Sequence, residues 1–203
     1  MGMDIQAKEF KKLSKRMSFN SKQYWEDRYK GNGNSGRGSY DEEAEKKANY
    51  INHLIIERNI KTINDYGHGD GNQLKYFVGF QNYCGFDVSE TARKKCEFIF
   101  SKDPKYKFIK DESMFEFSDL VLSLDVLYHL TEMEVYEDYL KKLFSIGKYV
   151  LIYAVDDDVV GPIHFQARKF TPYISEKFPE FELVEITNLI RSHVSMYLYK
   201  KKS

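Results

Sequence analysis

Three glycines spaced two positions apart, Gly67, Gly69 and Gly71, restrict the fold of this chain more than any other feature of its sequence. Asp65 precedes them, at the end of a short segment in which apolar and polar residues alternate. Glycine adopts positive φ angles and lets the backbone approach a ligand, because it has no Cβ. The dinucleotide fingerprint G-x-G-x-x-G would need its last glycine at position 72, where the chain has Asn72. The run therefore predicts a tight turn that binds a nucleotide-like ligand other than a dinucleotide.

The pattern from residue 60 onward predicts an α/β fold. Short apolar runs predict strands at 60–66, 82–87, 106–110, 119–124, 148–154, 182–188 and 195–200. Amphipathic stretches predict helices at 72–78, 89–101, 132–145 and 168–178, and an earlier one at 42–58. Alternating strands and helices are typical of a parallel sheet with helices on both faces. The last two strands are joined by a link too short for a parallel crossover, so we expect a seven-stranded, mostly parallel sheet with an antiparallel C-terminal strand.

The composition fits one domain of 203 residues with a sizeable core. Lys plus Arg number 31, as do Asp plus Glu, so the formal net charge is zero. Proteins that bind long nucleic acids usually carry a surplus of basic residues, so this balance weighs against such a partner.

The two cysteines, Cys84 and Cys96, have neither metal-ligand spacing nor the number needed for a disulfide framework. They indicate a reducing, cytoplasmic environment. No apolar run has membrane-spanning length, and the N-terminus lacks the apolar core of a signal peptide. Gln6 stands where a myristoylation site requires Ser or Thr, so we expect no lipid anchor.

Polar residues follow successive predicted strands at their carboxyl ends, where open α/β sheets bind ligands. Asp87 and Val88 follow the second strand, and a carboxylate at this distance from Asp65 suits the two hydroxyls of a ribose. Asp111 and Glu112 follow the third strand and offer acceptors to an exocyclic amine such as that of adenine. A single acidic residue after a strand is often only a turn residue or a helix cap. The order and spacing of the whole series nevertheless predict one site.

Ser123, Leu124 and Asp125 end the fourth strand and complete this series. Together with the D-x-G-x-G-x-G run, it resembles the class I S-adenosylmethionine (SAM)-dependent methyltransferases over most of residues 60–200. His68 departs from the family pattern, in which many relatives carry Cys.

The resemblance implies the Rossmann-like class I methyltransferase fold, SAM as the cofactor and S-adenosylhomocysteine as its product. Asp65 and the three glycines match motif I, Asp87 matches the ribose-binding acid, and Asp111 matches the adenine-binding acid. Ser123 to Asp125 match the segment that lines the methionine end of SAM.

The segment before the core divides into two parts. Residues 1–22 are basic, and we expect a frayed, solvated helix there. Residues 23–58 are expected to form a helical segment, followed by a SAM-binding core over 59–203.

The pattern Trp25-x-x-Arg28-Tyr29 followed by Ser35-Gly36-x-Gly38-Ser39 resembles small bacterial and viral methyltransferases, some of them associated with surface-polysaccharide genes. This resemblance implies a lid over the cofactor, with Tyr24 and Arg28 as cofactor contacts and Arg28 paired with the SAM carboxylate. The alternative is that Trp25 and Tyr29 pack the helix onto the core while Arg28 is solvated.

A hydroxyl acceptor needs a general base, and three residues near strand ends are candidates: Asp125, His129 and Tyr153. His129 shares a face with Asp125 if the segment is helical. The alternatives are a packing role for His129 and a place in the aromatic core for Tyr153.

Tyr128, His164 and Arg168 are candidate acceptor-binding residues. His164 and Arg168 lie four positions apart, so on a helix they would suit a phosphate or carboxylate of the acceptor. The alternatives are a core position for Tyr128 and a solvated polar face for the other two.

Asp125 together with Asp156 or Asp157 could also imitate the oxygen-rich Mg²⁺ site of catechol-type methyltransferases. A run of three Asp is equally typical of a solvated loop, so we expect no metal.

The leading hypothesis is a SAM-dependent methyltransferase acting at oxygen on a small-molecule or carbohydrate acceptor. One alternative is a nucleic-acid-modifying enzyme using the basic N-terminus and Lys200–Lys202, but the D/N-P-P-Y/F signature of amino-methylating DNA enzymes is missing after the fourth predicted strand. Another is a catalytically silent SAM-binding scaffold.

Overall fold

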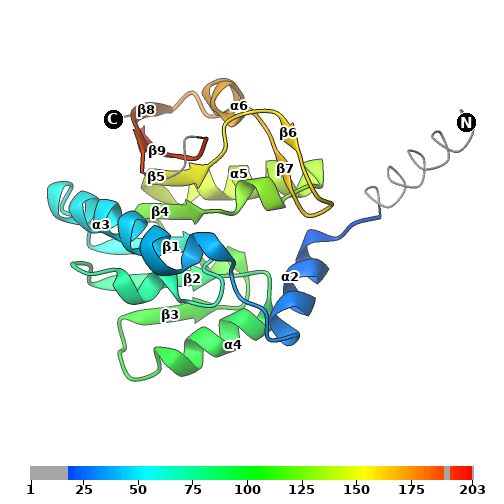
Figure 1. The fold of residues 1–203 in the computed structure, drawn as a ribbon. Helices are drawn as coiled ribbons and strands as arrows, with labels where there is room; N and C mark the ends of the chain where they lie inside the picture. Colours follow the sequence, from blue (N-terminus) through cyan, green and yellow to red (C-terminus); the bar gives the residue numbers. More distant parts are fainter. Residues whose placement is uncertain (1–17, 190–192, 203) are drawn as a thin grey trace, which may run out of the picture.

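A seven-stranded sheet runs through the middle of the protein in the order β3-β2-β1-β4-β5-β9-β8 (Figure 1). It is seen in a computed structural model that describes residues 18–189 and 193–202. Its strands are β1 (Thr62–Tyr66), β2 (Asn82–Phe86), β3 (Tyr106–Ile109), β4 (Ser118–Leu124), β5 (Gly147–Ala154), β8 (Phe181–Asn188) and β9 (Ser195–Lys201). The pairs from β3 through β5 are parallel, whereas β9 runs antiparallel to both neighbours, β5 and β8. The predicted sheet is therefore confirmed.

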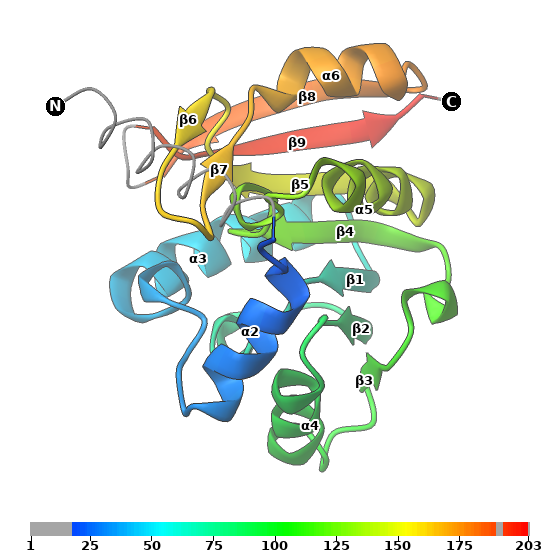
Figure 2. The ribbon, with the colours of Figure 1, turned by 90° about the vertical axis from the view of Figure 1, so that its right-hand side faces the viewer.

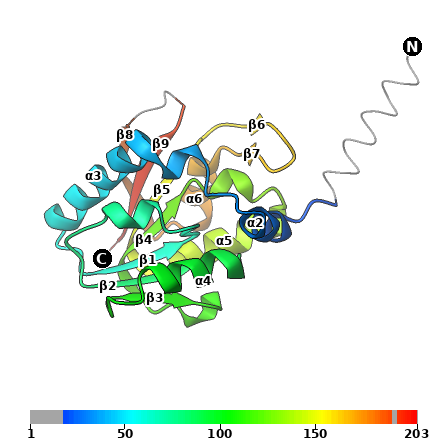
Figure 3. The same ribbon diagram turned by 60° about the horizontal axis from the view of Figure 1, so that its bottom comes forward.

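Helices cover both faces of this sheet. The covering helices are α3 (Asp41–Glu57), α4 (Glu90–Ile99), α5 (Met133–Ser145) and α6 (Phe170–Lys177), and a further helix, α2 (Ser21–Lys30), lies outside these layers. In Figures 1 and 3, α3 and α4 lie on one face and α5 and α6 on the other. The central strands β4 and β5 are apolar and buried over nearly their whole length, as expected for parallel strands covered on both sides. None of the described helices is long and apolar enough to cross a membrane.

The structure departs from the sequence prediction in two segments. The stretch predicted as a helix at 72–78 forms only a short 3-10 turn, Gln73–Tyr76. The link after β5 contains a small antiparallel hairpin, β6 (Val159–Val160) with β7 (Gln166–Ala167), which the sequence did not indicate.

The first residues of the chain fall partly outside the structure. Of the predicted basic extension, residues 1–17 lie outside the described part of the chain, and α2 begins at Ser21. Helix α2 stands apart from the layers, beside the carboxyl ends of β1 and β4, as Figure 2 shows from that side. Whether the predicted segment 23–58 acts as a lid stays a prediction.

Candidate functional site

The glycine run after β1 forms the tight turn that its sequence predicts. Gly67, Gly69 and Gly71 have φ angles of 105°, 59° and 75°, in the left-handed region that side-chain-bearing residues rarely adopt. A Cβ on Gly69 would overlap the hydroxyl of Ser35, and one on Gly71 would come within 2.8 Å of the Cys96 sulfur. Glycine is therefore required here by both backbone conformation and space.

Asp87 follows β2 and lies against this turn. Its Oδ2 accepts a hydrogen bond from the Gly69 backbone N–H at 2.9 Å, and its Oδ1 accepts one from the Ser89 N–H at 2.9 Å. These contacts fix the carboxylate at the carboxyl edge of the sheet, beside the glycine turn.

Asp65, the acid of the motif, is buried below the turn. Its Oδ2 accepts a hydrogen bond from the Tyr83 hydroxyl at 2.8 Å, while its Oδ1 has no hydrogen-bond partner among the described residues. Burial raises the pKa of Asp65 to about 7. A buried carboxyl with one unpaired oxygen is costly to the folded state.

A cavity of ≈ 390 Å³ opens between the strand ends and α2, and we call it the first cavity. The sheet side of its lining includes Gly67, Gly69, Asp87, Val88, Glu112, Leu124, Asp125 and His129. Its other wall includes Ser21, Trp25 and Tyr29 of α2. The structure thus brings eight of the predicted cofactor and catalytic residues to one cavity.

Helix α2 is held over this cavity by polar contacts at its N-terminus and at its middle. The Ser21 backbone N–H donates to Glu132 Oε1 at 2.7 Å. Glu26 accepts hydrogen bonds from the Ser89 hydroxyl at 2.6 Å and the Thr91 hydroxyl at 2.9 Å, at the start of α4. These hydrogen bonds, that of Ser89 above all, lower the pKa of Glu26 to about 2, so the carboxylate stays charged.

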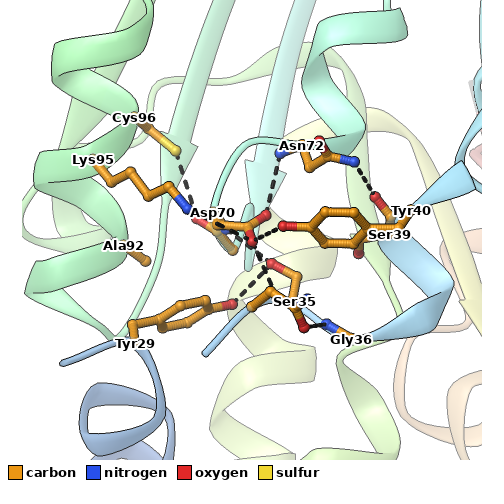
Figure 4. A network of polar contacts seen from close by, with 12 residues as sticks. Tyr29, Ser35, Gly36, Ser39, Tyr40, Asp70, Asn72, Ala92, Lys95 and Cys96 are labelled. Carbon is orange, nitrogen blue, oxygen red and sulfur yellow. Dashed lines mark hydrogen bonds and ion pairs between the residues drawn. The ribbon is translucent and has the colours of Figure 1, made fainter. Parts of the chain in front are cut away.

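Asp70, inside the glycine run, connects the turn to the loop that follows α2 (Figure 4). Its Oδ2 accepts hydrogen bonds from the Tyr40 hydroxyl at 2.6 Å and the Ser35 N–H at 3.2 Å. The Ser35 hydroxyl in turn accepts from the Asp70 N–H at 2.9 Å and lies 3.0 Å from the Tyr29 hydroxyl. The glycine turn and the loop that follows α2 are therefore joined by hydrogen bonds, which the sequence analysis did not predict.

Asp125, at the end of β4, forms an ion pair with Lys47 of α3. Lys47 Nζ lies 2.6 Å from Asp125 Oδ2, and the lysine side chain is completely buried. Asp125 Oδ1 accepts a hydrogen bond from the Tyr128 hydroxyl. The sequence analysis missed Lys47, although it lies between Ala44 and Ala48 on the apolar face of α3, and a charge on such a face is the signal that could have identified it.

His129 lies at the edge of the first cavity as a neutral ring. Its Nδ1 is 2.7 Å from the carbonyl oxygen of His164, so Nδ1 carries the proton and Nε2 is left as an acceptor. Burial lowers its pKa to about 4. The ring also packs edge-on against Trp25 of α2, with centroids 4.9 Å apart.

Several predicted site residues lie elsewhere. Tyr24 stacks on His164 with ring centroids 4.9 Å apart, and Tyr153 is completely buried with its ring 5.0 Å from Lys47 Nζ. The Arg28 Nε donates to the Asn34 carbonyl at 2.6 Å. None of these side chains is part of the first cavity's described lining, so their predicted roles stay predictions.

The same holds for Asp111, Ser123 and Arg168. Asp111 is exposed and accepts from the Ser113 N–H at 2.8 Å, while its neighbour Glu112 lines the cavity and accepts from the Tyr66 hydroxyl. Ser123 is buried and accepts from the Tyr139 hydroxyl at 2.8 Å.

Arg168 donates to the carbonyls of Leu130 and Thr131, each at 2.7 Å. Its guanidinium also lies 4.6 Å from the centre of the Tyr136 ring. Two of its donors are therefore used inside the protein.

The strand order, the antiparallel strand β9 and the glycine turn define the class I methyltransferase fold. An S-adenosylmethionine-dependent methyltransferase from Clostridium acetobutylicum superposes with a TM-score of 0.62 at 14% identity, covering 82% of this chain and 94% of that one. A candidate RNA methyltransferase from Pyrococcus horikoshii superposes with a TM-score of 0.55 at 19% identity, covering 77% and 82%.

An O-methyltransferase family protein from Burkholderia thailandensis also superposes, with a TM-score of 0.59 at 14% identity over 77% of this chain and 55% of that one. No protein-family model and no curated protein sequence matches the chain. At these identities the likeness shows the fold, which agrees with the sequence prediction.

Proposed function

We propose that the protein is a SAM-dependent methyltransferase that methylates a small-molecule or carbohydrate acceptor at oxygen. One observation carries the proposal: the glycine turn after β1 donates its Gly69 N–H to Asp87 after β2, and both line a single cavity of ≈ 390 Å³. Open α/β folds bind nucleotide-like ligands at this position.

The residues of the first cavity fit the parts of SAM. Asp87 is a charged acceptor beside the turn, suited to the two ribose hydroxyls, and Glu112 is an acceptor at the end of β3, suited to the adenine amine. Glycine at position 69 lets the turn lie close against Ser35 and Tyr29 beside the cavity, and this turn is suited to the methionine part. When bound, SAM supplies a methyl group that is already activated by its positive sulfur.

The chain's own residues then orient the acceptor and exclude water. Helix α2 covers the cavity through Trp25 and Tyr29. Asp125 and the Nε2 of His129 are acceptor groups in the lining of this cavity, and either can bind the hydroxyl of an acceptor. Holding that hydroxyl in line with the methyl group provides most of the rate enhancement expected of such an enzyme.

Oxygen methylation of a small acceptor is favoured over nucleic-acid methylation by the zero net charge of the chain. The candidate RNA methyltransferase among the similar structures shares the fold at only 19% identity. RNA therefore serves as a comparison substrate in the experiment below.

Methyl transfer from labelled SAM tests the proposal. The full chain is incubated with neutral sugars, small phenols, RNA and DNA, and label is expected in an acceptor of the first two groups. Asp125→Asn should reduce the rate about 100-fold, in the range usual for loss of a general base. Label in nucleic acid alone would contradict the small-acceptor proposal, and SAM binding without transfer to any acceptor would favour the silent scaffold.

A further inference from the structure

A second cavity lies on the other side of Asp125. It has a volume of ≈ 260 Å³ and shares Ser35, Asp125 and His129 with the first cavity. Its remaining lining comes from the loop at Gly36–Gly38 and from Tyr128, Val155, Phe165, His193 and Val194. The two cavities therefore meet at Asp125 and His129.

The backbone at this junction is strained, which is typical of functional positions. Asp125 has a φ of 62°, a conformation that costs about 1–3 kcal/mol for a residue other than glycine. Lys47 and Tyr128 hold its two carboxylate oxygens, and a Cβ on Gly38 would come within 2.6 Å of Oδ2. The carboxylate is thus fixed in one orientation where the two cavities join.

The charges around the second cavity are balanced. Arg37 is paired with Glu43 at 3.0 Å, and Asp125 is paired with Lys47 at 2.6 Å. His129 is neutral, since burial lowers its pKa to about 4, and the other histidine of the lining, His193, is exposed. The charges of these two ion pairs cancel, so an anionic group of an acceptor would find no surplus of positive charge here.

One part of this cavity's lining is aromatic and apolar, and the rest is polar. The rings of Tyr128 and Phe165 lie 5.0 Å apart, and Val155 and Val194 are buried beside them. Small-molecule sites typically combine aromatic and apolar side chains with a few placed polar groups that orient the ligand. Tyr128 and Phe165 offer ring faces here, and Asp125 is a fixed polar group. The volume lies below the roughly 300–1,000 Å³ of drug-sized sites, so the ligand is small.

We infer that the second cavity binds the methyl acceptor, and that the acceptor is an uncharged, ring-shaped hydroxyl compound of about monosaccharide size. This inference rests on the proposed function. The acceptor ring would pack against Tyr128 and Phe165, and its hydroxyl would donate to Asp125.

The reaction is then a balanced displacement. The hydroxyl oxygen forms a bond to the methyl carbon as the carbon–sulfur bond of SAM breaks. The bonding pair stays on sulfur, which becomes the neutral thioether of S-adenosylhomocysteine, and the hydroxyl proton passes to the Asp125 carboxylate and on to water.

The test needs no knowledge of the natural acceptor. Aza analogues of SAM, with nitrogen in place of sulfur, are prepared with three groups at the methyl position: methyl, a methylene-linked neutral hexose-sized ring, and the same ring bearing a phosphate. Calorimetry on the wild-type chain should show the neutral ring compound binding at least about tenfold more tightly than the methyl compound, a gain of roughly 1.4 kcal/mol. The phosphorylated ring should bind more weakly than the neutral ring.

Two variants test whether the gain in affinity for the neutral ring compound comes from the second cavity. Val155→Phe narrows the second cavity and should remove the gain, while Phe165→Ala removes a ring contact and should reduce it; both should leave the affinity for the methyl compound unchanged. Circular dichroism confirms that each variant is folded, and if Val155→Phe is not, Phe165→Ala decides.

Four results would overturn the inference. A neutral ring that gives no gain, or a gain that both variants leave intact, would mean that the second cavity does not receive the acceptor. A phosphorylated ring that binds most tightly would contradict an uncharged acceptor. If neither the methyl compound nor S-adenosylhomocysteine binds the wild-type chain, the proposed function itself fails, and this inference fails with it.

Discussion

Lys47 and Asp125 form an ion pair in which the lysine side chain has no exposed surface and the aspartate side chain is 12% exposed. Removing one partner of such a pair leaves a buried charge uncompensated, which typically costs about 3–5 kcal/mol. Lys47→Met should therefore lower the free energy of unfolding by roughly 3 kcal/mol or more. Urea unfolding measures this effect.

A double-mutant cycle separates the pair from the packing of the lysine chain. Lys47→Met combined with Asp125→Asn should lower the free energy of unfolding by less than the sum of the two single changes, because the double variant leaves no unpaired charge. Additive effects would mean that the two side chains are not coupled.

Asp65 should make stability depend on pH. Burial raises its pKa to about 7, whereas an unfolded Asp titrates at about 3.9. Between these values only the folded state holds the proton, so the stability from Asp65 is complete below about pH 4 and is lost as the pH rises through about 7. Urea unfolding across this pH window should show that the free energy of unfolding of the wild type falls relative to that of Asp65→Asn as the pH rises. A flat difference, or one of opposite slope, would contradict the assigned burial effect.

At the residue scale, sequence predicts the backbone-determined positions best. The three glycines could be placed because a tight turn with positive φ angles favours glycine. The place of Lys47 on the apolar face of α3 could indicate its burial, but its partner could not be predicted, because the sequence does not show that Asp125, after a distant strand, faces it. Asp111 and Glu112 are adjacent acids, and only the local 3-10 turn determines which of them reaches the cavity.

Helix α2 is the element whose attachment most directly controls access to the first cavity. Glu26 joins it to the start of α4 through Ser89 and Thr91. Hydrogen bonds to a charged group contribute about 1.5–3 kcal/mol, so Glu26→Gln should raise local opening of α2 roughly tenfold or more. Hydrogen exchange of the α2 amides measures that opening, and S-adenosylhomocysteine should associate and dissociate faster.

Asp27→Asn is the matched control, because Asp27 is exposed and its carboxylate accepts only from Gln23 among the described contacts. Equal exchange rates in Glu26→Gln and the wild type would show that Glu26 does not hold α2 closed.

Among the elements, strands and long helices were predictable because their apolar periodicity is set locally. The start of α6 was not: the sequence places it at 168, whereas Phe170 begins the helix because Asp156 accepts its N–H at 2.6 Å and that of Thr171 at 3.0 Å. That cap comes from the loop after β5, so no local pattern reveals it. The β6–β7 hairpin was likewise missed, since each of its strands has two residues and no measurable alternation.

For the whole molecule, the order of strands and helices along the chain was the best predictor of the fold. Alternating strands and helices predicted the parallel sheet, and the short last link predicted the antiparallel β9. The sheet then brings the ends of β1, β2 and β4 to one edge, so that residues far apart in sequence line the first cavity. The second cavity could not be predicted, because it depends on how the Gly36–Gly38 loop passes over Asp125.

The central claim is that the first cavity binds SAM, and calorimetry with S-adenosylhomocysteine tests it most directly. The account predicts saturable one-to-one binding to the wild-type chain. Asp87→Ala and Gly69→Val should each weaken it about 100-fold or more, the loss of nearly 3 kcal/mol expected when a charged acceptor or a required turn is removed. The exposed control Glu182→Ala on β8 should bind as the wild type does. Absence of binding to the wild type would contradict the account. So would a wild-type affinity in both Asp87→Ala and Gly69→Val.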